Sequence, residues 1–178
     1  MKTKYSYILT VFTFTLSVGI APLLLAQDKN PAPEAKPDNV DSKMFYRQTS
    51  AFKGHEGSVR GLDWSPDGKM LASCGDDNFV KVWDRQTNKL LLTLRGHTAV
   101  VRSVAWSADG KRLVSCGDDY SAKVWDSVTG KLIRSLEGHK DNVYAVAWSP
   151  DGRQLASGSE DRTAKIWNLQ NSEALYTM

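Results

Sequence analysis

Residues 73–84 of the chain read SCGDDNFVKVWD, and two later stretches repeat this pattern. Residues 115–126 read SCGDDYSAKVWD, and residues 157–168 read SGSEDRTAKIWN. Paired carboxylates, a thiol and a tryptophan this close together are compatible with a catalytic or metal site, and equally with a turn between two strands. Because the same residues occur three times at constant spacing, the pattern favours a structural device over a single reactive site.

The same period extends over most of the chain. Gly-His pairs begin at residues 54, 96 and 138, which is a spacing of 42 residues each time. All six tryptophans fall into two series with this period, namely Trp64, Trp106 and Trp148, and then Trp83, Trp125 and Trp167. A repeat of this length is typical of propellers and solenoids, in which each unit buries its apolar face against its neighbours.

Each unit contains the signals of four short strands. Apolar residues alternate in SVRGLDW (58–64) and SVAWS (103–107), as a half-buried strand requires. Ser-Pro-Asp-Gly at 65–68 and 149–152, with Ser-Ala-Asp-Gly at 107–110, predicts tight turns whose glycine takes a positive φ. The first unit then continues with the segment KMLASC, the Asp-Asp turn, the segment FVKVWD, the polar corner RQTNK and the segment LLLTL. The sequence therefore predicts an all-β fold.

The chain resembles the WD-repeat β-propeller family, which is named for the Trp-Asp that closes its third strand. The resemblance covers about residues 46–178 and rests on Gly-His, Ser-Pro-Asp-Gly, the Asp turn and Trp-Asp recurring in register. It implies three four-stranded antiparallel blades, each a segment of a propeller. YRQTSAFK at 46–53 aligns with KLLLTLR and KLIRSLE, so we expect one extra N-terminal outer strand before the first complete blade.

The resemblance also implies a hydrogen-bonded tetrad of His, Ser, Asp and Trp that ties each blade together. By motif position the tetrads are His55, Ser73, Asp77 and Trp83; His97, Ser115, Asp119 and Trp125; and His139, Ser157, Asp161 and Trp167. Such bonds satisfy polar groups that would otherwise be costly to bury. A hydrolase could use Ser, His and Asp, but the threefold repetition favours a structural role. Asn168, which replaces the Asp of Trp-Asp, lies outside the tetrad.

The sequence lacks the usual motifs of cofactor and metal chemistry. It contains no glycine-rich phosphate loop, Cys-x-x-Cys pair, His-Glu-x-x-His or calcium loop, so we expect no catalytic residue, cofactor or metal. Cys74 and Cys116 occupy equivalent positions in adjacent units, where the third unit has Gly158. Equivalent strands of neighbouring blades usually hold their Cα atoms beyond the ~7 Å limit for a disulfide. We therefore predict two small buried thiols.

Propellers of this family mostly bind protein partners, which implies a non-catalytic protein–protein interaction scaffold with a partner of unknown identity. Candidate partner-binding residues lie near the Asp turns and are the acidic residue before each tetrad Asp and a variable position after each Gly-His pair: Arg60, Asp76, Arg102, Asp118, Tyr144 and Glu160. The alternative is that they are solvated turn residues. The rival function is a fragment or subunit of a propeller enzyme or ligand-binding protein whose active part lies elsewhere.

The N-terminal residues have the pattern of a targeting segment. Lys2 and Lys4 precede residues 5–26, which carry no charge, and this predicts a signal peptide cleaved after Ala26. The same segment is long enough to remain as a membrane anchor. Either outcome predicts export, with a secreted, periplasmic or membrane-anchored protein. Residues 27–45 contain three prolines among polar residues and predict a disordered linker before the propeller segment at 46–178.

Net charge and repeat number limit the classes of partner and the kinds of assembly that we expect. The formal net charge of +3 includes Lys2 and Lys4, so the remaining chain is nearly balanced, which argues against nucleic acid as a partner. Closed propellers have about 4–8 blades, and the chain encodes three repeats. We therefore expect a truncated product, self-assembly of several copies into a closed ring, or an arc that binds another propeller fragment, rather than a free-standing monomer.

Overall fold

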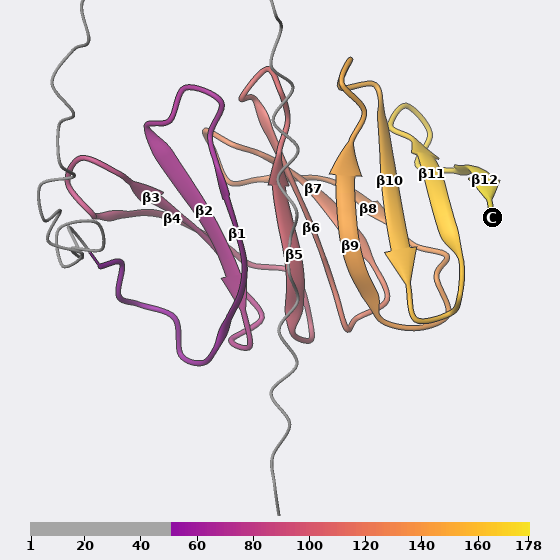
Figure 1. Ribbon diagram of the computed structural model, residues 1–178, viewed down its shortest axis with the longest axis horizontal. Coiled ribbons are helices and arrows are strands. Elements are labelled where there is room, and N and C mark those ends of the chain that lie inside the picture. The colour runs from indigo at the N-terminus through magenta and orange to yellow at the C-terminus, as the bar shows by residue number, and fades with distance from the viewer. Residues whose placement is uncertain (1–50) are drawn as a thin grey trace, which may run out of the picture. The chain divides into compact units, whose positions relative to one another are not determined.

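The computed structural model describes residues 51–178, which form three four-stranded β-sheets. Figure 1 shows the three sheets side by side in chain order, from purple through magenta to yellow. The predicted signal peptide and linker lie outside the described residues, as do residues 46–50 of the predicted outer strand. Within residues 51–178, no helix is long and apolar enough to cross a membrane.

Each sheet is an antiparallel meander, which we call a blade. Blade 1 contains β1 (Val59–Trp64), β2 (Met70–Gly75), β3 (Val80–Asp84) and β4 (Leu90–Leu94). Blade 2 contains β5 (Val101–Trp106), β6 (Arg112–Gly117), β7 (Ala122–Asp126) and β8 (Leu132–Leu136). Blade 3 contains β9 (Val143–Trp148), β10 (Gln154–Ser159), β11 (Ala164–Asn168) and β12 (Ala174–Thr177). The predicted all-β fold with three four-stranded blades is therefore confirmed.

The last part of the predicted extra strand is not a strand. Residues 51–53 have no strand assignment. An outer strand needs the exposed edge of a third strand to pair with, and among the described residues β3, β7 and β11 already pair with β4, β8 and β12. No partner edge is therefore available to residues 51–53 within this part of the chain.

The turns between the first two strands of each blade follow from Ser-x-Asp-Gly. The amide of Gly68 donates to the Ser65 carbonyl oxygen at 2.8 Å, and the Ser65 hydroxyl donates to Asp67 Oδ1 at 2.7 Å. Gly68 has a φ of 68°, and the equivalent Gly110 and Gly152 have 69° and 67°. Because this left-handed conformation carries no Cβ penalty in glycine, the predicted tight turns form in all three blades.

The core lies between the sheets. Alternate residues of a blade point toward the preceding blade, on what we call its leading face, and toward the following blade, on its trailing face. The trailing face of blade 1 contributes Ala72, Cys74, Val80 and Val82, which are 0% exposed. They form one cluster with leading-face residues of blade 2 that include Val104, Trp106 and Leu113. A second cluster joins blades 2 and 3 in the same way.

The two cysteines belong to these clusters. Cys74 and Cys116 are both free and buried, as predicted. Burial raises the pKa of the Cys74 thiol to about 12 and also raises the pKa of Cys116. Since the thiolate is the reactive form, both side chains act as small apolar packing groups.

Polar contacts also cross the interfaces between blades. The backbone amide of Trp106 donates to Asp63 Oδ2 at 2.7 Å, which links β5 to β1. Arg112 Nη2 donates to the Gly152 carbonyl oxygen at 2.9 Å, and the Arg112 guanidinium lies 4.6 Å from the centre of the Trp148 ring. Each interface therefore combines apolar packing with hydrogen bonds at its edges.

Candidate functional site

The structure brings the four side chains of each predicted tetrad together. In blade 2, Ser115 lies on β6 and Trp125 on β7, while His97 lies in the loop after β4 and Asp119 in the β6–β7 turn. His97 Nδ1 lies 2.8 Å from Asp119 Oδ2, and His97 Nε2 lies 2.7 Å from Ser115 Oγ. Trp125 Nε1 donates to the same Ser115 oxygen at 2.8 Å. The bonds therefore tie a loop, a turn and two strands into one unit.

The tetrads of blades 1 and 3 have the same connections. In blade 1 the His–Asp, His–Ser and Trp–Ser distances are 2.9, 2.8 and 2.7 Å, within His55, Asp77, Ser73 and Trp83. In blade 3 they are 2.8, 2.7 and 2.7 Å, within His139, Asp161, Ser157 and Trp167.

The glycine of the Gly-His pair has a steric reason in blades 1 and 2. Gly96 has a φ of 155°, and a Cβ built there would lie 3.0 Å from the Trp125 ring. A side chain at this position would push the tryptophan away from Ser115. The Gly-His pair thus combines the histidine of the tetrad with the close backbone approach that the tryptophan requires.

The direction of each hydrogen bond follows from the acceptor chemistry. An ionised carboxylate only accepts, so His97 Nδ1–H donates to Asp119 and Nε2 accepts from the Ser115 hydroxyl. The Ser115 oxygen then accepts from the Trp125 indole N–H. Every polar group is satisfied, although the side chains of His97 and Asp119 are only 1% and 7% exposed. Buried networks of this kind hold a structure rigid when all members are paired.

The Ser–His–Asp connectivity is that of a hydrolase triad, but its setting is different. A nucleophilic serine must be accessible to substrate and close to an oxyanion site. Ser115 is 0% exposed, and its oxygen already accepts from Trp125. The arrangement therefore suits strand-to-loop attachment rather than attack on a substrate.

The tetrad carboxylates are strongly stabilised in their ionised form. Burial raises the pKa of Asp77, but hydrogen bonds from Lys81 and His55 outweigh it and lower the pKa to about 2. Burial also raises the pKa of Asp119, and bonds from His97 and Ser121 bring it well below its usual value. The pKa of Asp161 is lowered in the same way by Thr163, the Lys140 amide and His139, against the effect of burial.

A further donor to each carboxylate differs between blades and was not anticipated from the sequence. Ser121 Oγ donates to Asp119 at 2.8 Å, and Thr163 Oγ1 donates to Asp161 at 2.6 Å. Blade 1 has Phe79 at the equivalent position, which has no side-chain donor. There Lys81 Nζ donates to Asp77 Oδ2 at 2.9 Å instead. The signal in the sequence was the phenylalanine at a position occupied by a hydroxyl in the other two units.

The Asp of Trp-Asp has a separate role in the next corner. Asp84 Oδ1 accepts from the Thr87 amide at 2.6 Å and from the Thr87 hydroxyl at 2.8 Å. Asp126 makes the same two bonds with Thr129. The side-chain oxygen of Asn168, Oδ1, accepts from the amide of Gln170 at 2.8 Å. Two replacements, Asn168 for the aspartate and Asn171 for the threonine, therefore accompany the different corner between β11 and β12, and the tetrad of blade 3 is intact.

The candidate partner-binding residues are paired with one another inside each blade. Arg60 Nε and Nη2 donate to the two carboxylate oxygens of Asp76 at 2.6 and 2.9 Å. Arg102 makes the same bidentate contact with Asp118, with Nε and Nη2 donating to the two carboxylate oxygens at 2.7 and 2.6 Å. The hydrogen bond from Arg60 lowers the pKa of Asp76. The arginine on the first strand and the acidic residue in the turn after the second strand are thus the two halves of one contact in blades 1 and 2.

Blade 3 replaces the ion pair with a hydrogen bond. The Tyr144 hydroxyl donates to Glu160 Oε2 at 2.5 Å, and Asn142 Nδ2 donates to the same oxygen at 2.8 Å. These bonds lower the pKa of Glu160, and Glu160 raises the pKa of Tyr144. The Arg102 guanidinium lies 5.7 Å from the centre of the Tyr144 ring, which links blades 2 and 3. We call the six residues Arg60, Asp76, Arg102, Asp118, Tyr144 and Glu160 the inner-strand row.

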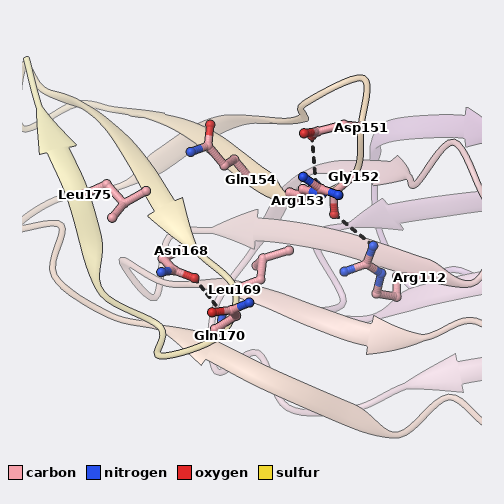
Figure 2. A pocket seen from close by; sticks show the side chains of 9 residues that line it. All are labelled: Arg112, Asp151, Gly152, Arg153, Gln154, Asn168, Leu169, Gln170 and Leu175. Carbon is pink, nitrogen blue, oxygen red and sulfur yellow. Dashed lines mark hydrogen bonds between the residues drawn. The ribbon is translucent and has the colours of Figure 1, made fainter.

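An open groove of about 670 Å³ lies between blades 2 and 3 (Figure 2). It is lined by Arg112, Asp151, Gly152, Arg153, Gln154, Asn168, Leu169, Gln170 and Leu175. Figure 2 shows Arg112 bonded to the Gly152 carbonyl, so one of the two arginines that line the groove already holds the blades together. Among residues 51–178, no group of three or more His, Cys, Asp or Glu side chains could hold a metal ion.

Three meandering sheets stacked in chain order, each tied by the same His–Ser–Trp–Asp bonds, define an arc of β-propeller blades. The chain matches the family described as "WD domain, G-beta repeat" at residues 46–84, 88–126 and 130–168. It therefore belongs to the WD-repeat family.

Similar proteins share parts of this arc. The chain is 38% identical over 58 residues to glutamate-rich WD repeat-containing protein 1 of Dictyostelium discoideum, covering 32% of this chain and 12% of that protein. It is 35% identical over 83 residues to ribosome biogenesis protein ERB1 of Phaeosphaeria nodorum, covering 44% of this chain and 11% of that protein. The chain thus matches about a tenth of the length of these curated relatives.

A solved structure extends the likeness to the fold. The structure of U3-55K superposes with a TM-score of 0.69 at 27% identity, over 71% of this chain and 41% of that chain. None of the three names denotes an enzyme. The family and these relatives support a protein-interaction scaffold as the general class of function.

Proposed function

We propose that the chain is a non-catalytic scaffold that binds a protein partner through the inner-strand row. The observation that carries this proposal is the contrast between two sets of residues at the same end of the blades. The tetrads keep the same four residue types in all three blades. The adjacent row changes from Arg–Asp in blades 1 and 2 to Tyr–Glu in blade 3. A constant framework with variable contact positions is the arrangement expected of a binding surface on a rigid scaffold.

The chemistry of the row suits a protein surface. The side chain of Arg60 is 43% exposed and that of Arg102 is 30% exposed, so both can gain contacts while they remain paired. Tyr144 is 46% exposed next to Arg102. Tyrosine and arginine are the residue types most enriched at the energetic centres of protein interfaces. The row therefore offers two charged pairs and, beside the second of them, an aromatic group to a partner of mixed charge.

The direct test replaces Arg60, Arg102 and Tyr144 by serine in one variant. Ion pairs at exposed positions contribute little to folding, so circular dichroism should show an unchanged β fold. Partner capture from an extract of the source organism, with the captured proteins identified by mass spectrometry, should be lost. The control variant carries Arg85→Ser, Val128→Ser and Arg153→Ser, three exposed positions outside the row. If the row variant and the wild type capture the same proteins equally, the proposal is wrong.

We also propose that the chain is exported. The support is the sequence of residues 1–26, in which two lysines precede an uncharged apolar segment. The test is expression of the full-length chain in its source organism, fractionation of the cells, and mass spectrometry of the N-terminus. We expect a chain that begins at Gln27, outside the cytoplasmic membrane. Recovery in the cytoplasm with residues 1–26 intact would contradict export, and recovery in the membrane fraction with these residues intact would indicate an anchor.

A further inference from the structure

Within residues 51–178, no blade covers the leading face of blade 1. Val59, Leu62 and Trp64 on β1 are 50%, 62% and 45% exposed. Their counterparts on β5 are 0%, 5% and 6% exposed, because blade 1 covers them (Val101, Val104 and Trp106). The same apolar positions are thus exposed or buried according to whether a blade precedes them.

Within the same residues, no blade covers the trailing face of blade 3. Ala156, Gly158, Ala164 and Ile166 are only partly buried. A Cβ built on Gly158 would meet nothing within 4 Å, although Cys116, its counterpart in blade 2, is 0% exposed. In blade 1 all four counterparts are 0% exposed: Ala72, Cys74, Val80 and Val82. Blade 3 therefore presents an apolar sheet face of the kind that blades 1 and 2 bury.

These two faces are the two halves of a contact that the chain already makes twice. A trailing face covers a leading face between blades 1 and 2, and again between blades 2 and 3. The hydrogen bond at the edge of the interface between blades 2 and 3 also has a possible equivalent between blade 3 of one copy and blade 1 of another. Arg112 donates to the Gly152 carbonyl between blades 2 and 3, and the counterparts of these two residues are Gln154 on blade 3 and Gly68 on blade 1. The amide of Gln154 supplies the same kind of donor.

We propose that two copies of this chain stack head to tail, with the trailing face of blade 3 of one copy on the leading face of blade 1 of the other. Two such contacts close a ring of six blades, because residues 51–178 of each copy form three. Closed propellers have about 4–8 blades, and two is the only number of three-bladed copies within that range. A contact between unlike faces forms a ring when its rotation closes. This inference does not depend on the proposed role of the inner-strand row.

The test uses two variants of the full-length chain, and each variant carries one new charge on one of the two faces. Gly158→Arg fills the open space on the trailing face, and Leu62→Glu charges an exposed residue of the leading face. Neither position is covered within the described monomer, so each variant should keep its β fold by circular dichroism. Val128→Glu is the matched control, since Val128 is 79% exposed in the corner between β7 and β8.

Sedimentation equilibrium over a range of concentrations is the measurement. We expect the wild type and the control to have twice the mass of one chain, and each face variant to have the mass of one. Association of each face variant should weaken by about 100-fold or more, because an unpaired charge would be buried in an apolar contact. A monomeric wild type would overturn the proposal, whether the faces are then covered by residues 1–50 or by another protein. So would dimers that persist in either face variant.

A mixing experiment identifies the head-to-tail geometry. Gly158→Arg leaves the leading face of one copy intact, and Leu62→Glu leaves the trailing face of the other intact. An equimolar mixture should therefore form a heterodimer through the single unmodified contact, detected by native mass spectrometry. A mixture that contains only monomers would show that the faces do not recognise each other, and the proposal would be wrong.

Discussion

Lys81 Nζ lies 2.9 Å from Asp77 Oδ2, so an ammonium group gives the blade 1 carboxylate a further side-chain donor, whereas in blades 2 and 3 a hydroxyl donates to the other oxygen, Oδ1. The same nitrogen lies 2.6 Å from the Gly54 carbonyl oxygen, next to the tetrad histidine. In blade 2 the equivalent Lys123 instead donates to Ser135 on the outer strand, at 3.0 Å. The same lysine position therefore donates to the tetrad carboxylate in blade 1, where Phe79 has no hydroxyl. In blade 2, where Ser121 supplies a hydroxyl, the lysine donates to the outer strand instead.

Replacement of Lys81 by methionine should destabilise the protein by about 1–3 kcal/mol, because it removes a charged donor from a buried carboxylate. Lys123→Met, the matched control, should cost less, since Ser121 already serves Asp119. Phe79→Ser combined with Lys81→Met should recover part of the loss by supplying the missing hydroxyl. Urea denaturation of the four proteins measures these differences. Equal costs for Lys81→Met and Lys123→Met would contradict the argument.

Acid should destabilise the protein through its tetrad carboxylates. The pKa of Asp77 is about 2 in the folded chain, and those of Asp119 and Asp161 are also lowered. An unfolded aspartate titrates near ~3.9, so these groups favour folding above that pH. Their contribution is lost as the pH falls from about 4 through the folded pKa values. Urea denaturation at pH 6, 4 and 3 should show a decreasing free energy of unfolding. Asp119→Asn should flatten this decrease, and an unaltered slope would exclude Asp119 as a source.

Ser115 should be structural and unreactive. Ser115→Ala leaves the indole N–H of Trp125 and Nε2 of His97 without a buried partner, which we expect to cost about 1–3 kcal/mol in thermal or urea unfolding. Ser135→Ala, at a more exposed serine on β8, should cost less. The wild type should not react with a fluorophosphonate probe for nucleophilic serines. Labelling that Ser115→Ala abolishes would instead support the enzyme alternative.

Arg162→Asn should stabilise blade 3. Arg162 has a φ of 68°, and blade 1 has Asn78 at the equivalent position with a φ of 65°. A left-handed backbone costs an ordinary residue about 1–2 kcal/mol, and asparagine tolerates it better. We expect a gain of about 0.5–1 kcal/mol in the free energy of unfolding. Arg153→Asn, at an exposed arginine without a positive φ, should produce no such gain. Equal effects of the two substitutions would show that backbone strain is not the cause.

Repetition made much of the molecule predictable. The 42-residue period places Gly-His, Ser-x-Asp-Gly and Trp-Asp at fixed points, and local chemistry then places the turns between strands. The tetrads could be predicted because each member occupies the same motif position in every unit. The Lys81–Asp77 bond could not, because it compensates for a missing hydroxyl and becomes visible only when the side chains are seen together.

By itself, then, the sequence determined the strand content, the number of blades and the chemistry of the repeated framework, because these depend on local patterns. The tertiary structure alone decided which variable residues meet. Arg60 and Asp76 are paired because the register of β1 and β2 places Val59 opposite Gly75, and that register depends on cross-strand hydrogen bonds. It also decided which apolar residues are buried. Leu62 and Val104 occupy the same position in the repeat, but only Val104 has a blade in front of it.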